Sequence, residues 1–182
     1  MLDKNEIQET LTILDSLKVD TEYLSKNKEP YLLSLSDLND IDHNILNKKY
    51  YDILTKIKQH QTSLSIVSNL LFDNNQIKFD NYPDKRILKN SSQNLKNYNI
   101  IKLLETDNSK KYRTNKYSVD IEKFREYNKN ILDKINYSLL IIKYILYLEK
   151  SEFKVIYGED MFNRITNSFW KLRETEKKKN KD

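Results

Sequence analysis

The chain has 182 residues, with 32 Lys and Arg against 27 Asp and Glu, for a formal net charge of +5. It contains no Cys and a single glycine, Gly158. This composition excludes disulfides, cysteine zinc ligands and thiol catalysis, and it leaves little material for a glycine-rich phosphate loop. The length suits one domain, or one domain with an oligomerisation segment.

Charged residues are distributed unevenly along the chain. Residues 1–47 carry 4 Lys against 10 Asp and Glu (net −6), residues 48–119 carry 14 Lys and Arg against 6 acids (net +8), and residues 120–182 carry 14 against 11 (net +3). The abundance of Asn, Lys, Ile and Tyr is typical of an AT-rich genome, so the overall charge is poor evidence for nucleic-acid binding. The concentration of basic residues in the middle segment is the better indication, because a DNA-binding surface needs a local positive potential.

The first 44 residues are predicted to form an acidic, mostly helical extension. Ile7, Leu11 and Leu14 have the spacing of an amphipathic helix over residues 5–17. Residues 36–40 then offer N-cap side chains for a further helix. The extension has three possible roles: it packs on the winged domain, binds a partner or supplies part of a dimer interface.

The next segment predicts two helices and a short strand. The first helix spans residues 41–60, and Thr62 or Ser63 caps a second helix that ends at residue 72. Residues 77–79 alternate between apolar and polar, which favours a strand.

Residues 84–98 predict a helix with two distinct faces. Ile87, Leu88, Leu95 and Tyr98 can share one side of it, because residues three, four and seven apart stack on the same face of a helix. Pro83 fits just ahead of the helix or in its first turn. The opposite side carries donors that can bond phosphate or base edges, namely Lys85, Arg86, Lys89, Asn90, Gln93, Asn94 and Lys96.

A strand, a turn and a return strand follow this helix. Residues 100–104 form the first strand, residues 107–110 have turn chemistry, and residues 112–119 form the second. The turn and the start of the return strand add further polar and basic side chains, Asn108, Lys110, Lys111, Tyr112 and Arg113.

The pattern NLKNYNIIKLLE, followed by DNSKKYRTNKYSV, resembles the recognition helix and wing of winged helix-turn-helix DNA-binding proteins, in particular MarR-like and ArsR-like transcription regulators. The resemblance covers about residues 45–120. Leu95, the step at residues 98–101 and Tyr117 occupy the corresponding places. Asn99 stands where that family usually has glycine, and Asn enters the left-handed backbone region more easily than most residues.

The resemblance implies a mostly α fold with a small β-hairpin wing, in which residues 45–119 form a winged helix-turn-helix DNA-binding domain. The helix at residues 84–98 would enter the major groove of double-stranded DNA, and the wing tip at residues 108–113 would reach the neighbouring backbone or minor groove. Base edges would be nearest to Lys89, Asn90, Gln93 and Asn94, and phosphates to Arg86 and Lys96.

Beyond the wing, Ser118 or Asp120 can cap a long helix whose apolar positions continue to Leu146. A small winged domain cannot cover so long a stripe, so the partner is either the last segment of this chain or a second copy. Residues 120–172 are therefore predicted to be a helical dimerisation segment that forms a homodimer. Gly158 interrupts the pattern, and a last helix begins at residue 159 and leads into a basic tail.

The sequence predicts no catalytic activity, no metal site and no cofactor. The only histidines, His43 and His60, lie near predicted helix ends, where a surface or capping role is the commoner one. The 13 tyrosines could stack on single-stranded nucleic acid, but those in the long helix are better placed for packing.

The longest apolar run, residues 139–148, is interrupted by Lys143 and is about half of a bilayer span. The chain also begins without the pattern of a signal peptide, so a cytoplasmic location and no membrane partner are expected.

The sequence thus predicts a dimeric, sequence-specific double-stranded DNA-binding protein that regulates transcription. It names no operator and no small-molecule effector. A plasmid or viral replication initiator or partition protein is one alternative, and a winged-helix protein-interaction module is another.

Overall fold

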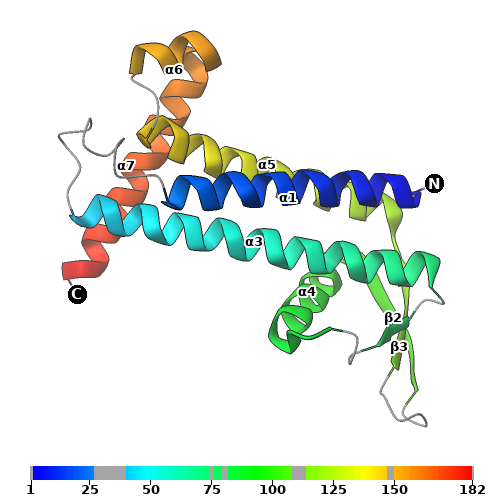
Figure 1. Ribbon diagram of the computed structural model, residues 1–182. Helices are drawn as coiled ribbons and strands as arrows, with labels where there is room; N and C mark the ends of the chain where they lie inside the picture. Colours follow the sequence, from blue (N-terminus) through cyan, green and yellow to red (C-terminus); the bar gives the residue numbers. More distant parts are fainter. Residues whose placement is uncertain are drawn as a thin grey trace. The chain divides into compact units, whose positions relative to one another are not determined.

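The computed structural model describes residues 2–26, 40–73, 76–78, 82–107, 114–146 and 150–181 (Figure 1). Its helices and strands are, in chain order, α1 (Lys4–Lys26), α3 (Asp40–Phe72), β1 (Gln76–Lys78), α4 (Lys85–Asn97), β2 (Ile101–Asp107), β3 (Thr114–Val119), α5 (Ile121–Leu146), α6 (Lys150–Tyr157) and α7 (Glu159–Lys181). This part of the chain is mostly helical with a small antiparallel sheet, which confirms the coarse fold class predicted from the sequence.

The chain forms two compact units. Unit 1 comprises Met1–Leu17 and Thr55–Asp133, and unit 2 comprises Lys18–Leu54 and Lys134–Asp182. Unit 1 therefore contains α4 and the sheet, whereas unit 2 contains α6 and α7. Each unit also includes segments of α1, α3 and α5.

The two helices predicted for residues 41–60 and 62–72 are one helix, α3, so that prediction is wrong. The Thr62 hydroxyl donates to the Lys58 carbonyl, one turn back, at 3.0 Å, as a residue inside a helix does. Neither Pro nor Gly occurs in α3, so nothing in the backbone interrupts the apolar spacing. The two predicted amphipathic segments consequently join without a break.

The strands form one antiparallel sheet in the order β1-β3-β2 (Figure 1). Ile101 pairs with Val119 at one end of the β2-β3 hairpin, and the register shifts between Leu103 and Glu105. The central strand β3 contributes Tyr117, which is fully buried. The predicted strands at 77–79, 100–104 and 112–119 thus correspond to β1, β2 and β3, and residues 79, 112 and 113 lie outside the described residues.

Unit 1 has a core shared by its helices and the sheet. The buried side chains include Ile7, Leu14, Leu64, Val67, Leu70, Ile77, Leu88, Leu95, Ile101 and Phe124. Polar contacts at the edge of this core connect α1 to the other two long helices: Gln61 donates to Asp15 at 2.9 Å, and Arg125 pairs with Glu6 at 3.0 Å. In unit 1 the start of the acidic extension, residues 4–17, therefore packs on α3 and α5, which favours a packing role among the three left open by the sequence.

Unit 2 buries the second half of the α5 stripe. Ile135, Leu139 and Ile142 are each at most 2% exposed. The Tyr137 hydroxyl lies 2.6 Å from Ser168 Oγ on α7, and the Lys143 ammonium lies 3.4 Å from the Asp20 carboxylate on α1. In unit 2, helices of the same chain thus cover these positions of the α5 stripe, and the contact with α7 agrees with the first of the two predicted partners, the last segment of the chain.

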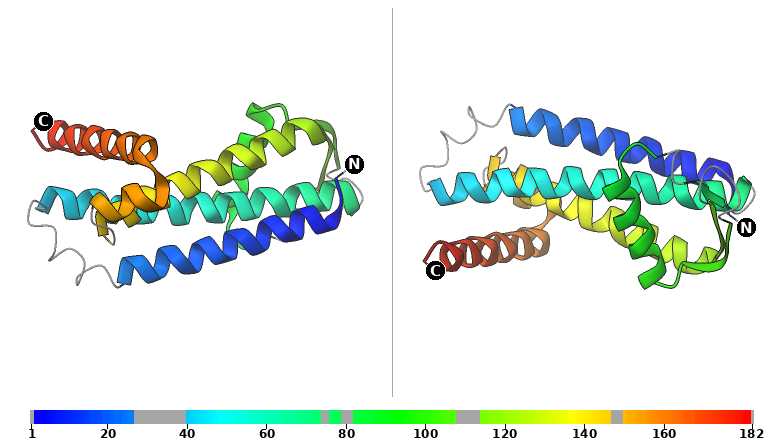
Figure 2. Two further views of the ribbon diagram at one scale, coloured as in Figure 1. Left: turned by 90° about the horizontal axis from the view of Figure 1, so that it is seen from above. Right: turned by 90° about the horizontal axis from the view of Figure 1, so that it is seen from below.

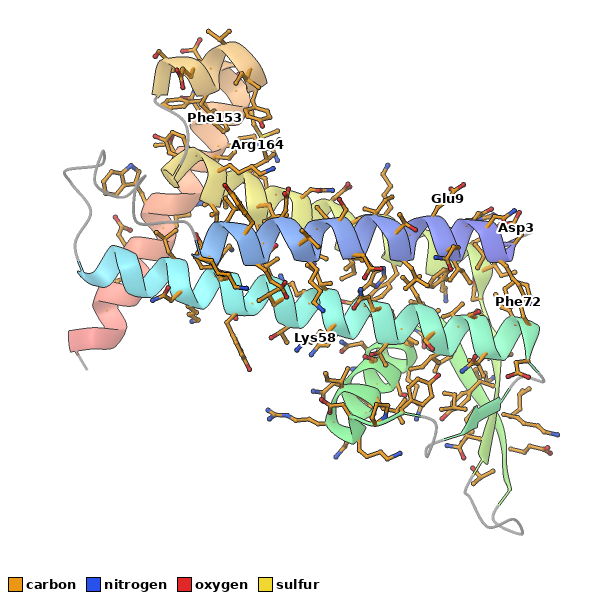
Figure 3. The ribbon with its side chains drawn as sticks, in the orientation of Figure 1. Asp3, Glu9, Lys58, Phe72, Phe153 and Arg164 are labelled. Carbon is orange, nitrogen blue, oxygen red and sulfur yellow. The ribbon has the colours of Figure 1, made fainter. Side chains whose placement is uncertain are left out.

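Helix α7 follows α6 after a sharp turn in unit 2 (Figure 2), and aromatic side chains of both helices pack together with Tyr144 of α5. Gly158 separates the two helices with φ +90°, a left-handed conformation that favours glycine. Phe153 on α6, labelled in Figure 3, lies 5.2 Å from Tyr144 and 6.2 Å from Phe162 between ring centroids. The break at Gly158 and the start of α7 were predicted from the sequence, whereas α6 was not predicted as a separate helix.

Candidate nucleic-acid interface

Helix α4 carries the seven predicted DNA-contacting residues that precede the wing, and most of them are exposed. It contains four cations and no carboxylate. The five exposed members of the predicted set are Lys85, Arg86, Lys89, Asn90 and Gln93, and the two half-buried members are Asn94 and Lys96. The exposed face is therefore both basic and rich in side chains that can bond base edges.

The opposite face of α4 is buried. Leu88 and Leu95 are at most 2% exposed, and the Ser91 hydroxyl donates to the Gln59 carbonyl of α3 at 3.0 Å. Tyr98 was predicted on this face, but it is 59% exposed and serves as the C-cap of the helix. The apolar face is completed instead by small serine side chains, which allow α4 to approach α3 closely.

Both ends of α4 are set by local hydrogen bonds. Asp84 is the N-cap and its carboxylate accepts from the Ile87 N–H at 3.1 Å, with Pro83 immediately before it as predicted. At the other end Asn99 has φ 57°, in the left-handed region. The Ile100 N–H donates to the Leu95 carbonyl and the Asn99 N–H to the Lys96 carbonyl, each at 2.9 Å, which is a Schellman motif.

This C-terminal motif sets the direction in which the chain leaves α4 and enters β2. Its two apolar positions, Leu95 and Ile100, are both buried, as the motif favours. The prediction that Asn99 takes the left-handed place of glycine is confirmed. Because this motif fixes the backbone between α4 and β2, it also fixes the orientation of α4 relative to the hairpin within unit 1.

Two residues on the helix have partners that the sequence did not indicate. Gln93 Nε2 donates to Asn97 Oδ1 at 2.9 Å, one turn along the exposed face. The Lys96 ammonium lies 5.4 Å from the centre of the Tyr117 ring on β3, a cation–π distance. Asn97 was absent from the predicted set, although its position four residues after Gln93 could have indicated it.

The hairpin provides part of the predicted wing. On it Lys116 pairs with Glu105 at 2.9 Å, and both side chains are solvent-accessible, so the pair stabilises the hairpin only weakly. Lys102 on β2 is exposed. The predicted wing-tip contacts lie outside the described residues, namely Asn108, Lys110, Lys111, Tyr112 and Arg113.

A groove of about 420 Å³ lies beside the start of α4. Its lining comes from one stripe of α3 and from the approach to α4: Lys58, Gln61, Thr62, Ser65, Asn69, Tyr82, Pro83 and Ile87. Sequence reasoning missed this groove. It treated Thr62 as a helix cap, and only the continuous helix α3 aligns these polar residues on one face.

His60 is buried inside unit 1, so its predicted surface or capping role is wrong. It is 2% exposed and lies in the middle of α3 rather than at a helix end. Its Nε2 is 2.6 Å from Asn128 Oδ1 on α5, and the His60 ring centre is 5.8 Å from that of Tyr127. Burial lowers the pKa of His60 below its ordinary value, although the bond to Asn128 acts in the opposite direction.

The hydrogen-bond chain around His60 fixes its tautomer. Thr10 Oγ1 donates to the Glu6 carbonyl and accepts from Asn128 Nδ2 at 3.3 Å. Asn128 therefore presents its oxygen to His60, and His60 Nε2 must carry the proton. Among the described residues, Nδ1 has no hydrogen-bond partner.

Tyr127 joins this cluster to the end of α4. The Tyr127 ring lies 5.1 Å from that of the C-cap residue Tyr98. Burial raises the pKa of the Tyr127 hydroxyl, and Tyr98 raises it further. The cluster contributes packing and polar contacts where α1, α3 and α5 meet the end of α4 within unit 1.

No group of three or more His, Asp or Glu side chains suited to a metal ion occurs in the described part of the chain. Within those same residues, no helix is long and apolar enough to cross a membrane. The chain matches no protein-family model, no curated protein and no solved structure.

Proposed function

We propose that this chain is a dimeric, sequence-specific protein of the winged helix-turn-helix type that binds double-stranded DNA and regulates transcription. The single observation that carries the proposal is the exposed face of α4, which combines cations with Asn and Gln side chains on a helix that has no carboxylate. A solvated surface helix ordinarily intersperses charges of both signs.

The surroundings of α4 support the same function. The helix is followed directly by the β2-β3 hairpin, and the sheet order β1-β3-β2 pairs the hairpin with the strand that precedes α4. Residues 73–84 separate α3 from α4, which is longer than the three- or four-residue turn of a helix-turn-helix. The proposal therefore depends on α4 and the hairpin rather than on that turn.

In this mechanism α4 enters the major groove. Lys89, Asn90, Gln93 and Asn94 bond base edges, and Arg86 bonds phosphate. Lys96 stabilises the hairpin beside the helix through Tyr117 and adds positive charge there. Dimerisation through residues 120–172 sets the spacing of the two half-sites.

The first experiment is a titration of labelled random duplex DNA with the full chain, followed by fluorescence anisotropy between 50 and 200 mM salt. The logarithm of the affinity should fall linearly with the logarithm of the salt concentration, with a slope of about −0.9 per phosphate neutralised. Absence of binding at low salt would contradict the proposal and favour a protein-interaction module.

A pair of variants tests the role of α4 on a selected DNA sequence. Lys89→Ala should reduce the preference for that sequence over random DNA by about 1 to 3 kcal/mol, because a base contact is lost. Lys129→Ala removes an exposed lysine from α5 in the same unit and should leave the preference unchanged. Equal losses on both DNAs for Lys89→Ala would show that Lys89 contacts only the backbone.

A further inference from the structure

The groove beside α4 has two walls. One consists of polar side chains of α3, and the other consists of residues just before α4 and in its first turn. Lys58, Thr62, Ser65 and Asn69 recur every three or four residues and so form one stripe of α3. Tyr82, Pro83 and Ile87 form the other wall. Figure 3 shows Lys58 on the side of α3 that carries α4.

Hydrogen-bond donors are available in this groove. Lys58 is exposed, and no ion-pair partner for it exists among the described residues. Tyr82 is 9% exposed, and its hydroxyl accepts from Asn69 Nδ2 at 2.8 Å, which leaves the hydroxyl proton free to donate. The eight lining residues include one cation and no carboxylate, so the site suits a single negative charge.

The groove and the hairpin lie on opposite flanks of α4. Ile87 faces the groove, whereas Lys96 lies over Tyr117 of β3. These two positions are nine residues apart, which is about two and a half turns and therefore opposite sides of a helix. The exposed basic face, with Lys89 and Gln93, lies between them.

This arrangement corresponds to the geometry of a major groove. A helix with its side chains is about 10–12 Å across and the major groove about 12 Å wide, so each flank of an inserted helix approaches a phosphate backbone. The hairpin would approach the backbone on one flank. The groove with Lys58 would then face the backbone on the other.

We propose that this groove binds a phosphodiester of the DNA strand across α4 from the hairpin, with Lys58 as the cation and the hydroxyls of Ser65 and Tyr82 as hydrogen-bond donors. This assignment rests on the proposed function and deepens it. The contact positions α4 on the duplex and reads no sequence.

The test compares two lysines on the same helix. Lys58→Gln should lower the affinity for random and selected duplexes alike, by about 5- to 10-fold at 0.1 M salt, and reduce the salt slope by about 0.9. Lys56→Gln makes the same charge change two residues away, where the exposed side chain points to the other side of α3. It should leave the slope unchanged.

A neutral variant and free phosphate complete the experiment. Ser65→Ala should weaken binding to both duplexes without changing the slope, since it removes a donor but no charge. An unchanged slope for Lys58→Gln, with normal binding by the parent protein, would overturn the groove assignment alone. The groove assignment would also be overturned if Lys58→Gln left the salt slope unchanged but abolished the thermal stabilisation that inorganic phosphate gives the parent protein. That result would indicate a site for free phosphate. A parent protein that does not bind DNA would overturn the proposed function itself.

Discussion

At the scale of single residues, the packing of His60 links stability to pH. The imidazole is 2% exposed, Asn128 accepts its one N–H, and no carboxylate or second acceptor among the described residues stabilises the imidazolium. Burial lowers its pKa, so the folded protein takes up a proton at a lower pH than the unfolded chain does. Below the ordinary histidine pKa of about 6.5 the unfolded state therefore binds more protons.

The free energy of unfolding should consequently fall as the pH drops below about 6.5, with a slope from this residue of at most about 1.4 kcal/mol per pH unit. The measurement is urea unfolding from pH 7.5 to 5. His60→Gln should remove this part of the pH dependence, because glutamine does not titrate. His43→Gln replaces the only other histidine and serves as the control. Equal pH dependence in His60→Gln and the parent would contradict the assignment.

Residue environments differ in how far the sequence alone could predict them. The left-handed conformation of Asn99 was predictable, because it depends on a helix end and its immediate neighbours. The burial of His60 was not, since its partner Asn128 is 68 positions away along the chain, and Thr10, which orients Asn128, is 50 positions from His60. Local chemistry fixes a cap, whereas the environment of a core polar group depends on which helices meet.

At the scale of elements, α3 shows why capping residues mislead when they occur inside a helix. Thr62 has the side chain of an N-cap, but its hydroxyl instead donates to the carbonyl of Lys58 one turn back. Periodicity alone is the same for one long helix and for two collinear ones. By contrast, α4 was delimited correctly, because Asp84 and Asn99 enclose it at both ends.

Substitution of Thr62 tests whether α3 is one helix or two, because the change in the free energy of unfolding has opposite signs in the two cases. Thr62→Ala should increase the free energy of unfolding by a few tenths of a kcal/mol, since alanine has the higher helix propensity in a helix interior. A true N-cap behaves in the opposite way, and Asp84→Ala in α4 should cost about 1 kcal/mol. Both are measured by urea unfolding at pH 7.5. A loss of about 1 kcal/mol for Thr62→Ala would indicate a second helix that starts there.

At the scale of the whole molecule, sequence reasoning found the polar face of α4 but not the groove beside it. The face depends on spacing within one helix. The groove depends on Lys58 and Ser65 of α3 approaching Tyr82 and Ile87, and this proximity arises only when the two helices pack. Similarly, the apolar stripe of α5 was visible in the sequence, but the sequence could not decide between the last segment of the same chain and a second copy as its cover.

The proposed dimer therefore needs a surface other than the α5 stripe, and α6 offers one. Val155 and Ile156 are adjacent, 86% and 60% exposed, and continue into the partly exposed Tyr157. Contiguous exposed apolar side chains are characteristic of interaction surfaces, and a symmetric dimer is the commonest assembly.

Sedimentation velocity should show a dimer for the parent protein and a monomer for Val155→Asp, because an aspartate at the seam would have to lose its hydration. Val19→Asp, at a valine that is 65% exposed on α1 of the same unit, should remain dimeric. A Val155→Asp variant that stays dimeric would exclude α6 from the interface, and a monomeric parent would remove dimerisation from the proposed mechanism.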